Sequence, residues 1–223
     1  MTKTITTFAK QIIPPATQVI IIALLIIPLL IIAFPAYSQD TSLTELQTKA
    51  LVLNKQGKYS EAVKAAEEAL EITEVNFGPD HPKTAASMSI MGLIYFSHGK
   101  YSNAEPLYLN ALKINEKALG KEHPDVASDL DNLALLFQAQ GRYSESIPLY
   151  IRALQIKKKI FGPDHLNVAT TMNNLGALYY SQGMYKEAEP LFRQVLTIRE
   201  KTRGTDHDNM TTSLNILALV YQA

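Results

Sequence analysis

The chain contains no cysteine and no tryptophan. Without cysteine it has neither a disulfide framework nor thiol chemistry. It also has no excess of either charge, because 21 lysines and arginines balance 21 aspartates and glutamates. Since phosphate binding needs clustered positive charge, nucleic acid is not an expected partner.

Patterns that carry catalysis are missing as well. The sequence has no glycine-rich phosphate loop, no nucleophile elbow and no HExxH pattern. Its polar residues recur in a repeating column or are scattered singly, whereas catalysis needs groups that converge within hydrogen-bond reach. We therefore expect no enzymatic activity and no cofactor.

The first 38 residues differ from the rest of the chain. Two lysines precede an uncharged run from Val19 to Phe34, and the small residues Ala36 and Ser38 lie where a signal peptidase reads its substrate. The segment is interpreted as a cleaved signal peptide or, alternatively, as an uncleaved signal anchor, although the run spans only about 24 Å as a helix at ~1.5 Å per residue. Both readings place the following residues outside the cytoplasm. The expected location is periplasmic or extracellular, or membrane-anchored with the folded part outside.

A repeat of constant length occupies the remainder. Glycine recurs every 42 residues, at Gly57, Gly99, Gly141 and Gly183, and the residues around it recur in the same register. A period of this size indicates a copied supersecondary unit that buries its apolar face against its neighbours. The predicted units are about 43–82, 83–124, 125–166 and 167–208, followed by an extra helix at 209–223.

Each unit is predicted to hold two helices. Leu130, Leu133, Ala134 and Phe137 recur at spacings of three and four, which is typical of one buried helical face. Small residues share one column and predict the closest helix contact; they are Ala50, Gly92, Ala134, Gly176 and Ala218. The second helix is predicted to start at a serine cap, Ser60, Ser102 or Ser144, and to end at a glycine, Gly78, Gly120 or Gly162.

The pattern of small residue, aromatic, Gly-Lys/Arg-Tyr, Ala and Ala-Leu resembles the tetratricopeptide repeat. The 42-residue period, with Gly-Pro-Asp-His in the loop and Glu-Pro-Leu-Tyr in the second helix, is similar to the kinesin-light-chain type. The resemblance covers residues 43–223. It implies an all-α fold, a right-handed α-solenoid of antiparallel helix pairs, whose first helices line a concave groove for peptides or partner proteins.

On this resemblance, the groove-facing positions give a candidate site. The partner-binding residues it implies mix amide, aromatic and acidic side chains; they are Ser89, Phe96, Asp131, Asn132, Gln138, Asn173, Asn174, Tyr180 and Asn215. The alternative is that these are ordinary helix-surface residues. Clamping of a terminal carboxylate is not expected, because no lysine or arginine lies at 126–140 or 168–182.

Four histidines recur at equal spacing in the loops, at His81, His123, His165 and His207. A metal site is not expected, because equivalent atoms in successive units lie at least about 10 Å apart, whereas zinc ligands each lie ~2 Å from the metal. The histidines and the acidic residue before each are instead predicted to fasten the inter-repeat loop by hydrogen bonds.

The sequence ends inside a first helix that has no pairing helix. The unpaired apolar residues near Ala223 predict either self-association at that end or continuation into a longer protein. The main functional hypothesis is a protein-binding scaffold with no catalytic or metal site. The alternative is a regulatory or recruiting N-terminal arm of a larger enzyme or signalling protein whose effector domain is missing from this chain. Membrane contact is expected only through the N-terminal segment if it is uncleaved.

Overall fold

The structure is a computed structural model that describes residues 42–203 and residue 218. The chain divides into two units, Met1–Leu46 and Gln47–Ala223, and the array of helices belongs to the second. Every regular element in the described ranges is an α-helix. The apolar segment at 1–38 lies outside the described residues, as does the extra helix at 209–223 apart from Ala218.

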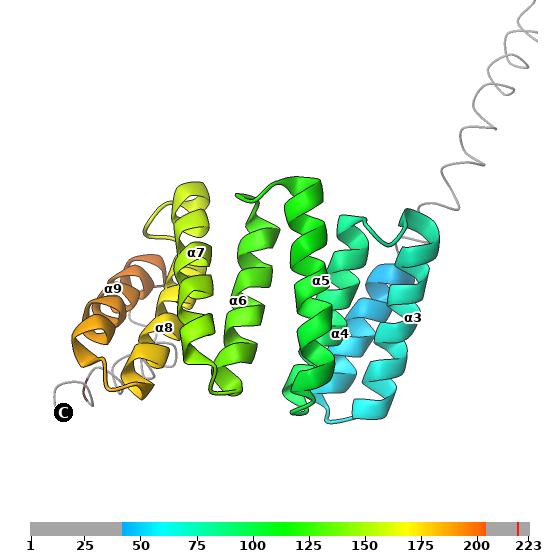
Figure 1. Cartoon of the computed structure of the whole chain (residues 1–223), viewed down its shortest axis with the longest axis horizontal. Coiled ribbons are helices and arrows are strands. Elements are labelled where there is room, and N and C mark those ends of the chain that lie inside the picture. The colour runs from blue at the N-terminus through cyan, green and yellow to red at the C-terminus, as the bar shows by residue number, and fades with distance from the viewer. Residues whose placement is uncertain (1–41, 204–217, 219–223) are drawn as a thin grey trace, which may run out of the picture. The chain divides into compact units, whose positions relative to one another are not determined.

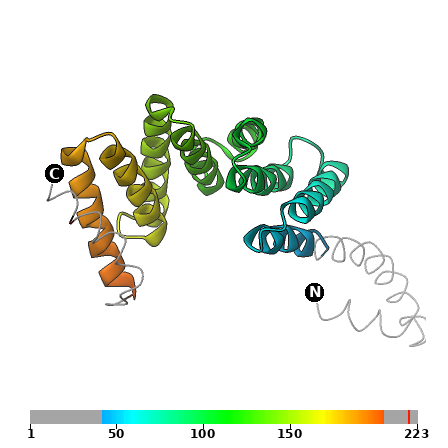
Figure 2. The same cartoon turned by 90° about the horizontal axis from the view of Figure 1, so that it is seen from below.

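Helices of two lengths alternate along the array (Figures 1 and 2). The first helices of the pairs have 16 residues: α4 Pro82–Ser97, α6 Pro124–Ala139 and α8 Leu166–Ser181. The second helices have 19: α3 Tyr59–Phe77, α5 Tyr101–Leu119, α7 Tyr143–Phe161 and α9 Tyr185–Arg203. A helix at 42–55 precedes α3. Each helix packs on the next in sequence, and successive first helices also touch. The all-α class and the solenoid of helix pairs are confirmed.

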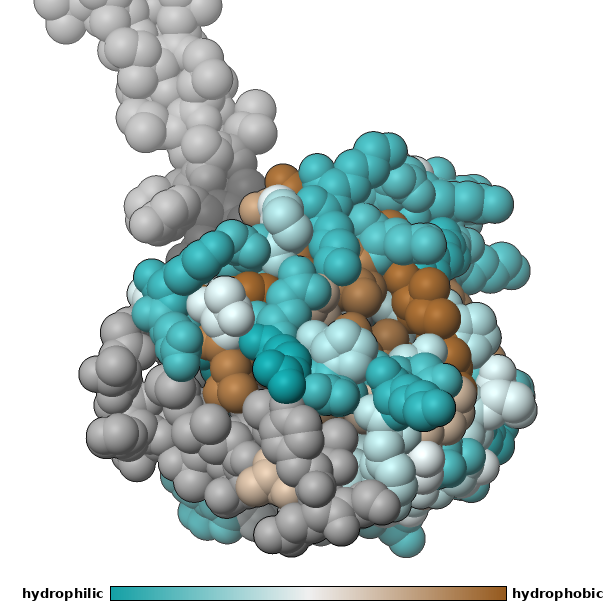
Figure 3. All heavy atoms as spheres, turned by 90° about the vertical axis from the view of Figure 1, so that its left-hand side faces the viewer, coloured by the Kyte–Doolittle hydropathy of each residue, from teal (hydrophilic) through white to brown (hydrophobic). Residues whose placement is uncertain are grey.

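The apolar core of the array is divided into local clusters. One cluster joins Ala50, Ala66 and Ile94 near the start of the array, and another joins Tyr108 to Leu133 further along. At the α9 end, apolar side chains gather in the middle of the visible face between hydrophilic ones (Figure 3). Each repeat therefore shields the apolar face of its neighbour, as the repeated pattern predicts. None of the helices in the described ranges is both long and apolar enough to cross a membrane.

The small-residue column lies at the closest helix contact. A Cβ atom added to Gly92 would lie 2.7 Å from the Tyr108 ring, and one on Gly176 would lie 2.9 Å from the Phe192 ring. The prediction is confirmed for these glycines and wrong for Ala218, which is exposed. The aromatic partner follows its glycine by 16 positions, which for Ala218 would fall beyond the end of this sequence.

Two kinds of turn connect the helices. Gly120 ends α5 with φ 89° and ψ 154°, a region that only glycine adopts readily, so the predicted glycine stop is confirmed. The predicted serine caps are wrong, because Lys58, Lys100 and Arg142 hold the cap position without a side-chain bond. The Lys100 amide donates to the Tyr95 carbonyl at 2.9 Å and closes the preceding helix. The next helix begins immediately, so the serine already lies within it.

Candidate functional site

The first helices present a nearly uncharged side. In α4, α6 and α8 the charged residues are Lys83 and Asp125 in the first turns, together with Asp129 and Asp131. Eight predicted partner-binding residues lie half-buried on these helices: Ser89, Phe96, Asp131, Asn132, Gln138, Asn173, Asn174 and Tyr180. Together with Leu93, Leu135 and Ala177 of the same helices, we call these residues the first-helix face. Asn215 lies outside the described residues.

Hydrogen bonds link successive first helices at one repeating position. Gln47 donates from Nε2 to Ser87 Oγ at 3.1 Å. One repeat later Ser89 donates from Oγ to Asp129 Oδ1 at 3.0 Å. One repeat further, Thr171 donates from Oγ1 to an oxygen of the Asp131 carboxylate at 2.8 Å. Two of the predicted partner-binding residues, Ser89 and Asp131, are therefore engaged in contacts between repeats.

The second helix adds a third polar side chain to each of the last two contacts. Asn115 donates from Nδ2 to Asp129 Oδ2 at 2.7 Å, and both side chains are buried. Among the described residues Asp129 contacts these neutral donors and forms no ion pair, so burial raises its pKa to about 6, and nearby Asp125 acts in the same direction. This junction holds one buried carboxyl group without a counter-charge.

The following junction holds a buried ion pair. Lys157 of α7 donates from Nζ to the Asp131 carboxylate and to Thr171 Oγ1, the latter at 3.0 Å. The side chains of Lys157 and Asp131 are only 9% and 13% exposed. Burial raises the pKa of Asp131 and the lysine opposes this effect. The second oxygen, Asp131 Oδ1, is buried without a hydrogen-bond partner. The buried Asp131 carboxylate therefore depends on Lys157 for its counter-charge.

Sequence reasoning missed Asn115 and Lys157, although a signal for them exists. Their column also contains Thr73 and Arg199, so it is polar in every repeat. It nevertheless lies in the buried stripe of the second helix, where Thr73 is fully buried. A polar column inside a buried stripe indicates a hydrogen-bonded contact, since buried polar groups need partners.

Two asparagines of the first-helix face have no hydrogen-bond partner among the described residues. Asn132 and Asn174 occupy the same position in successive repeats, and neither bonds to any residue that the structure describes. An amide presents both donors and an acceptor. These two side chains can therefore hydrogen-bond the backbone of a bound chain.

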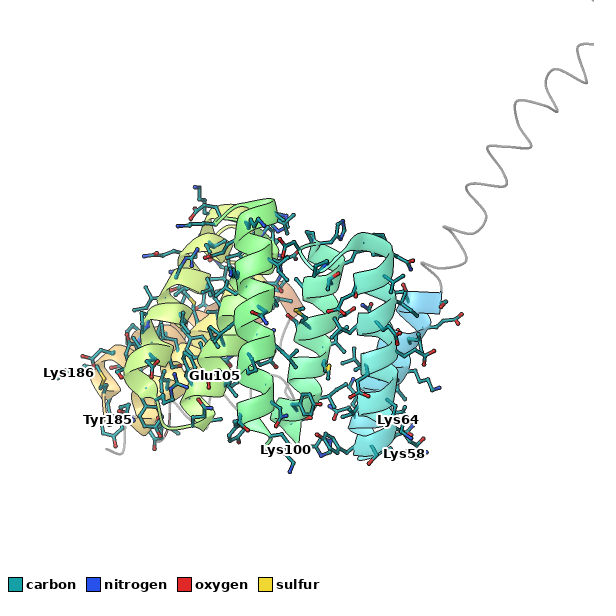
Figure 4. The ribbon with its side chains drawn as sticks, turned by 45° about the vertical axis from the view of Figure 1, so that its right-hand side comes forward. Lys58, Lys64, Lys100, Glu105, Tyr185 and Lys186 are labelled. Atoms are coloured by element: carbon teal, nitrogen blue, oxygen red, sulfur yellow. The ribbon has the colours of Figure 1, made fainter. Side chains whose placement is uncertain are left out.

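Aromatic rings border the face near the tight turns. Phe96 lies 5.7 Å from the Tyr101 ring, and Tyr180 lies 5.4 Å from the Tyr185 ring, between ring centroids. Gln138, at the equivalent position between them, accepts from the Tyr150 hydroxyl at 3.2 Å. Figure 4 shows Tyr185 on the same edge of the array as Lys58 and Lys100 of the earlier turns.

The loop histidines cap the first helices. Nδ1 of His81, His123 and His165 accepts from the backbone amide two residues later at 3.1, 3.2 and 3.1 Å. The predicted role in fastening the loop by hydrogen bonds agrees with this geometry, and His207 lies outside the described residues. Within 42–203, no His, Cys, Asp or Glu side chains form a group of three that could hold a metal ion.

These helix pairs, joined by tight glycine turns and linked by inter-repeat hydrogen bonds, define an α-solenoid of repeated two-helix units. The sequence-family model of the tetratricopeptide repeat matches residues 40–108, 91–150 and 128–201. The chain belongs to the tetratricopeptide repeat family.

Solved structures share this fold. BtubC (BKLC) from P. vanneervenii is 24% identical, with a TM-score of 0.71 over 83% of this chain and 81% of that chain. A Podosopora anserina protein of kinesin-light-chain type, with nearly identical TPR-like repeats, is 27% identical, with a TM-score of 0.69 over 81% of this chain and 85% of that chain. A point variant of that protein gives 27% and 0.70 over the same shares. No curated protein matches the chain.

Proposed function

We propose that this chain is a non-enzymatic scaffold that holds a peptide or partner protein in a concave groove lined by the first-helix face. Its family generally serves as a scaffold for protein–protein interaction. The observation that carries the proposal is the pair Asn132 and Asn174, whose side chains are half-buried on a face with few charged residues and make no hydrogen bond to any residue that the structure describes.

The chemistry of the face favours a ligand with few charges. Asn132 and Asn174 bond an extended backbone, while Leu93 and Tyr180 provide apolar contact for its side chains. A charged side chain placed against this face would lose water without gaining a partner, which is costly. The ligand is therefore an extended segment rich in small, apolar or amide residues.

Selection from a displayed random peptide library tests this proposal. Peptides selected on the wild-type chain are expected to be poor in charged residues and to bind at least about tenfold more weakly to an Asn132→Ala, Asn174→Ala variant, since each loses about 1 kcal/mol or more of hydrogen bonding. The matched control, Asn103→Ala with Gln155→Ala, changes exposed residues of α5 and α7 and should bind as the wild type does. Equal binding to both double variants contradicts the proposal.

A second candidate is the recruiting arm of a larger enzyme or signalling protein. Reading the coding sequence past Ala223 separates the two candidates. An immediate stop codon excludes the larger protein, whereas a further open reading frame supports it.

We also propose that the array works outside the cytoplasm. The lysines, the apolar run and the small residues of 1–38 support export. A fusion of alkaline phosphatase after Ala223 is expected to be active, because that enzyme needs an oxidising compartment for its disulfides. The mass of the product distinguishes a cleaved signal from an anchor, and an inactive fusion of normal abundance contradicts export.

A further inference from the structure

A cleft lies between the second half of α5 on one side and α4 with the loop before it on the other. Its volume is about 260 Å³. Met88 and Ile114 provide apolar lining, and Asp80, Lys113 and Lys117 provide charged lining. The space suits one large side chain of a partner, below the roughly 300 Å³ at which pockets for whole small molecules begin.

The next repeat shows why this cleft is open. There Arg152 of α7 donates to the Lys121 carbonyl at 3.3 Å and pairs with Glu116 at 2.6 Å. The residue equivalent to Arg152 is Asn110, which is too short to make these contacts. Both acceptors have equivalents one repeat earlier, in the Pro79 carbonyl and Glu74. Between the first two repeats, the group that is missing is a guanidinium able to bridge these two acceptors.

Exposure of the apolar lining agrees with this comparison. Met88 is half-buried, whereas its equivalent Leu130 is fully buried. Ile114 is 7% exposed, and its equivalent Ile156 is 2% exposed. The main difference in the lining is therefore at Met88, which is partly accessible where Leu130 is not.

The charged residues that line the cleft are one aspartate and two lysines. Lys117 pairs with Asp80 at 2.6 Å, and both side chains are about two-thirds exposed. Lys113 makes no ion pair with any residue that the structure describes. Its equivalents in the next two repeats are Gln155 and Thr197, so this charge is particular to the cleft.

We propose that this cleft is a second binding site, independent of the groove, which takes an aliphatic side chain flanked by carboxylates from an acidic segment of a partner protein. The aliphatic group contacts Met88 and Ile114. A carboxylate beside it faces Lys113, which complements its charge and selects against a basic segment. The site thus differs in specificity from the first-helix face, whose charged member Asp131 is already paired with Lys157.

Methyl NMR of the full chain labelled at its six methionines tests the proposal. The probe is the peptide acetyl-Glu-Leu-Glu-amide, and the Met88 signal is assigned with Met88→Leu. We expect the Met88 methyl to shift saturably with this peptide at millimolar concentration. Acetyl-Lys-Leu-Lys-amide, which has the opposite charge, is expected to bind at least about tenfold more weakly.

Asn110→Arg is the matched variant, since it restores the residue found in the next repeat. It is expected to abolish the Met88 shift while leaving the other methionine methyl signals at their wild-type positions. The proposal is overturned if Met88 does not respond in the wild type, if both peptides bind equally, or if Asn110→Arg still binds. None of these results affects the groove, whose asparagines lie on α6 and α8.

Discussion

Replacing Lys157 with methionine is expected to lower the free energy of unfolding by about 3 to 5 kcal/mol, because it leaves the buried Asp131 carboxylate without its counter-charge. Methionine retains most of the side-chain volume, so the loss reports the charge rather than a cavity. Urea unfolding followed by circular dichroism measures the effect. A loss below about 1 kcal/mol would mean that the pair contributes no more than a surface ion pair.

Lys159→Met is the control on the same helix. Lys159 pairs with Glu122 at 3.0 Å, but both side chains are more than half exposed. Solvent screens this pair, so its removal is expected to cost no more than about 1 kcal/mol.

A combined replacement tests whether the uncompensated charge is the cause. The first junction of the array uses the neutral residues Gln47, Thr73 and Ser87 at the equivalent positions. Changing Asp131, Lys157 and Thr171 to glutamine, threonine and serine copies that junction. We expect this triple variant to recover most of the stability lost in Lys157→Met. If it is no more stable than the single variant, packing rather than charge explains the loss.

Replacing Asp129 with asparagine is expected to stabilise the array by about 2 to 3 kcal/mol at pH 7.5, since each pKa unit corresponds to about 1.4 kcal/mol. Burial raises the pKa of Asp129 from 3.8 to about 6, so the ionised form is the costly one. Asparagine fits the same space and can still bond to Ser89 and Asn115. Urea unfolding of the variant and the wild type at this pH measures the gain.

The pH dependence of the wild type has a definite sign. Between pH 4 and 6 the folded chain holds a proton on Asp129 that the unfolded chain has lost, so this residue makes stability fall as pH rises through that window. Asp129→Asn should remove that slope. Asp125→Asn, at an exposed carboxylate of the same helix, should retain most of it, because burial contributes more to the raised pKa than Asp125 does. An unchanged slope in Asp129→Asn would show that the buried carboxyl is not its source.

Much of the fold could be predicted from periodicity. The glycines that end α3, α5 and α7, the small residues facing Tyr108 and Phe192, and the two-helix unit all follow from local patterns, because turn conformation and helix contact depend on residues close in sequence. The serine caps could not be predicted correctly. The second helix begins at the tyrosine before the serine, because the turn geometry there depends on how the preceding helix ends.

The candidate site was only partly predictable. The repeat register placed the groove residues on the first helices, but it treated Ser89 and Asp131 in the same way as Asn132 and Asn174. Their difference depends on the neighbouring repeat, since Asp129 and Thr171 reach the first pair and nothing described reaches the second.

By itself, the sequence determined the repeat length, the helix pairs and the uncharged side of the first helices, because these depend on local spacing and composition. Only the tertiary structure decided which polar side chains join repeats and which stay available to a ligand. The cleft beside Asn110 likewise became evident only in the tertiary structure. The physical reason is distance: a side chain is committed or free according to what an adjacent repeat brings within hydrogen-bond reach, and no single repeat contains that information.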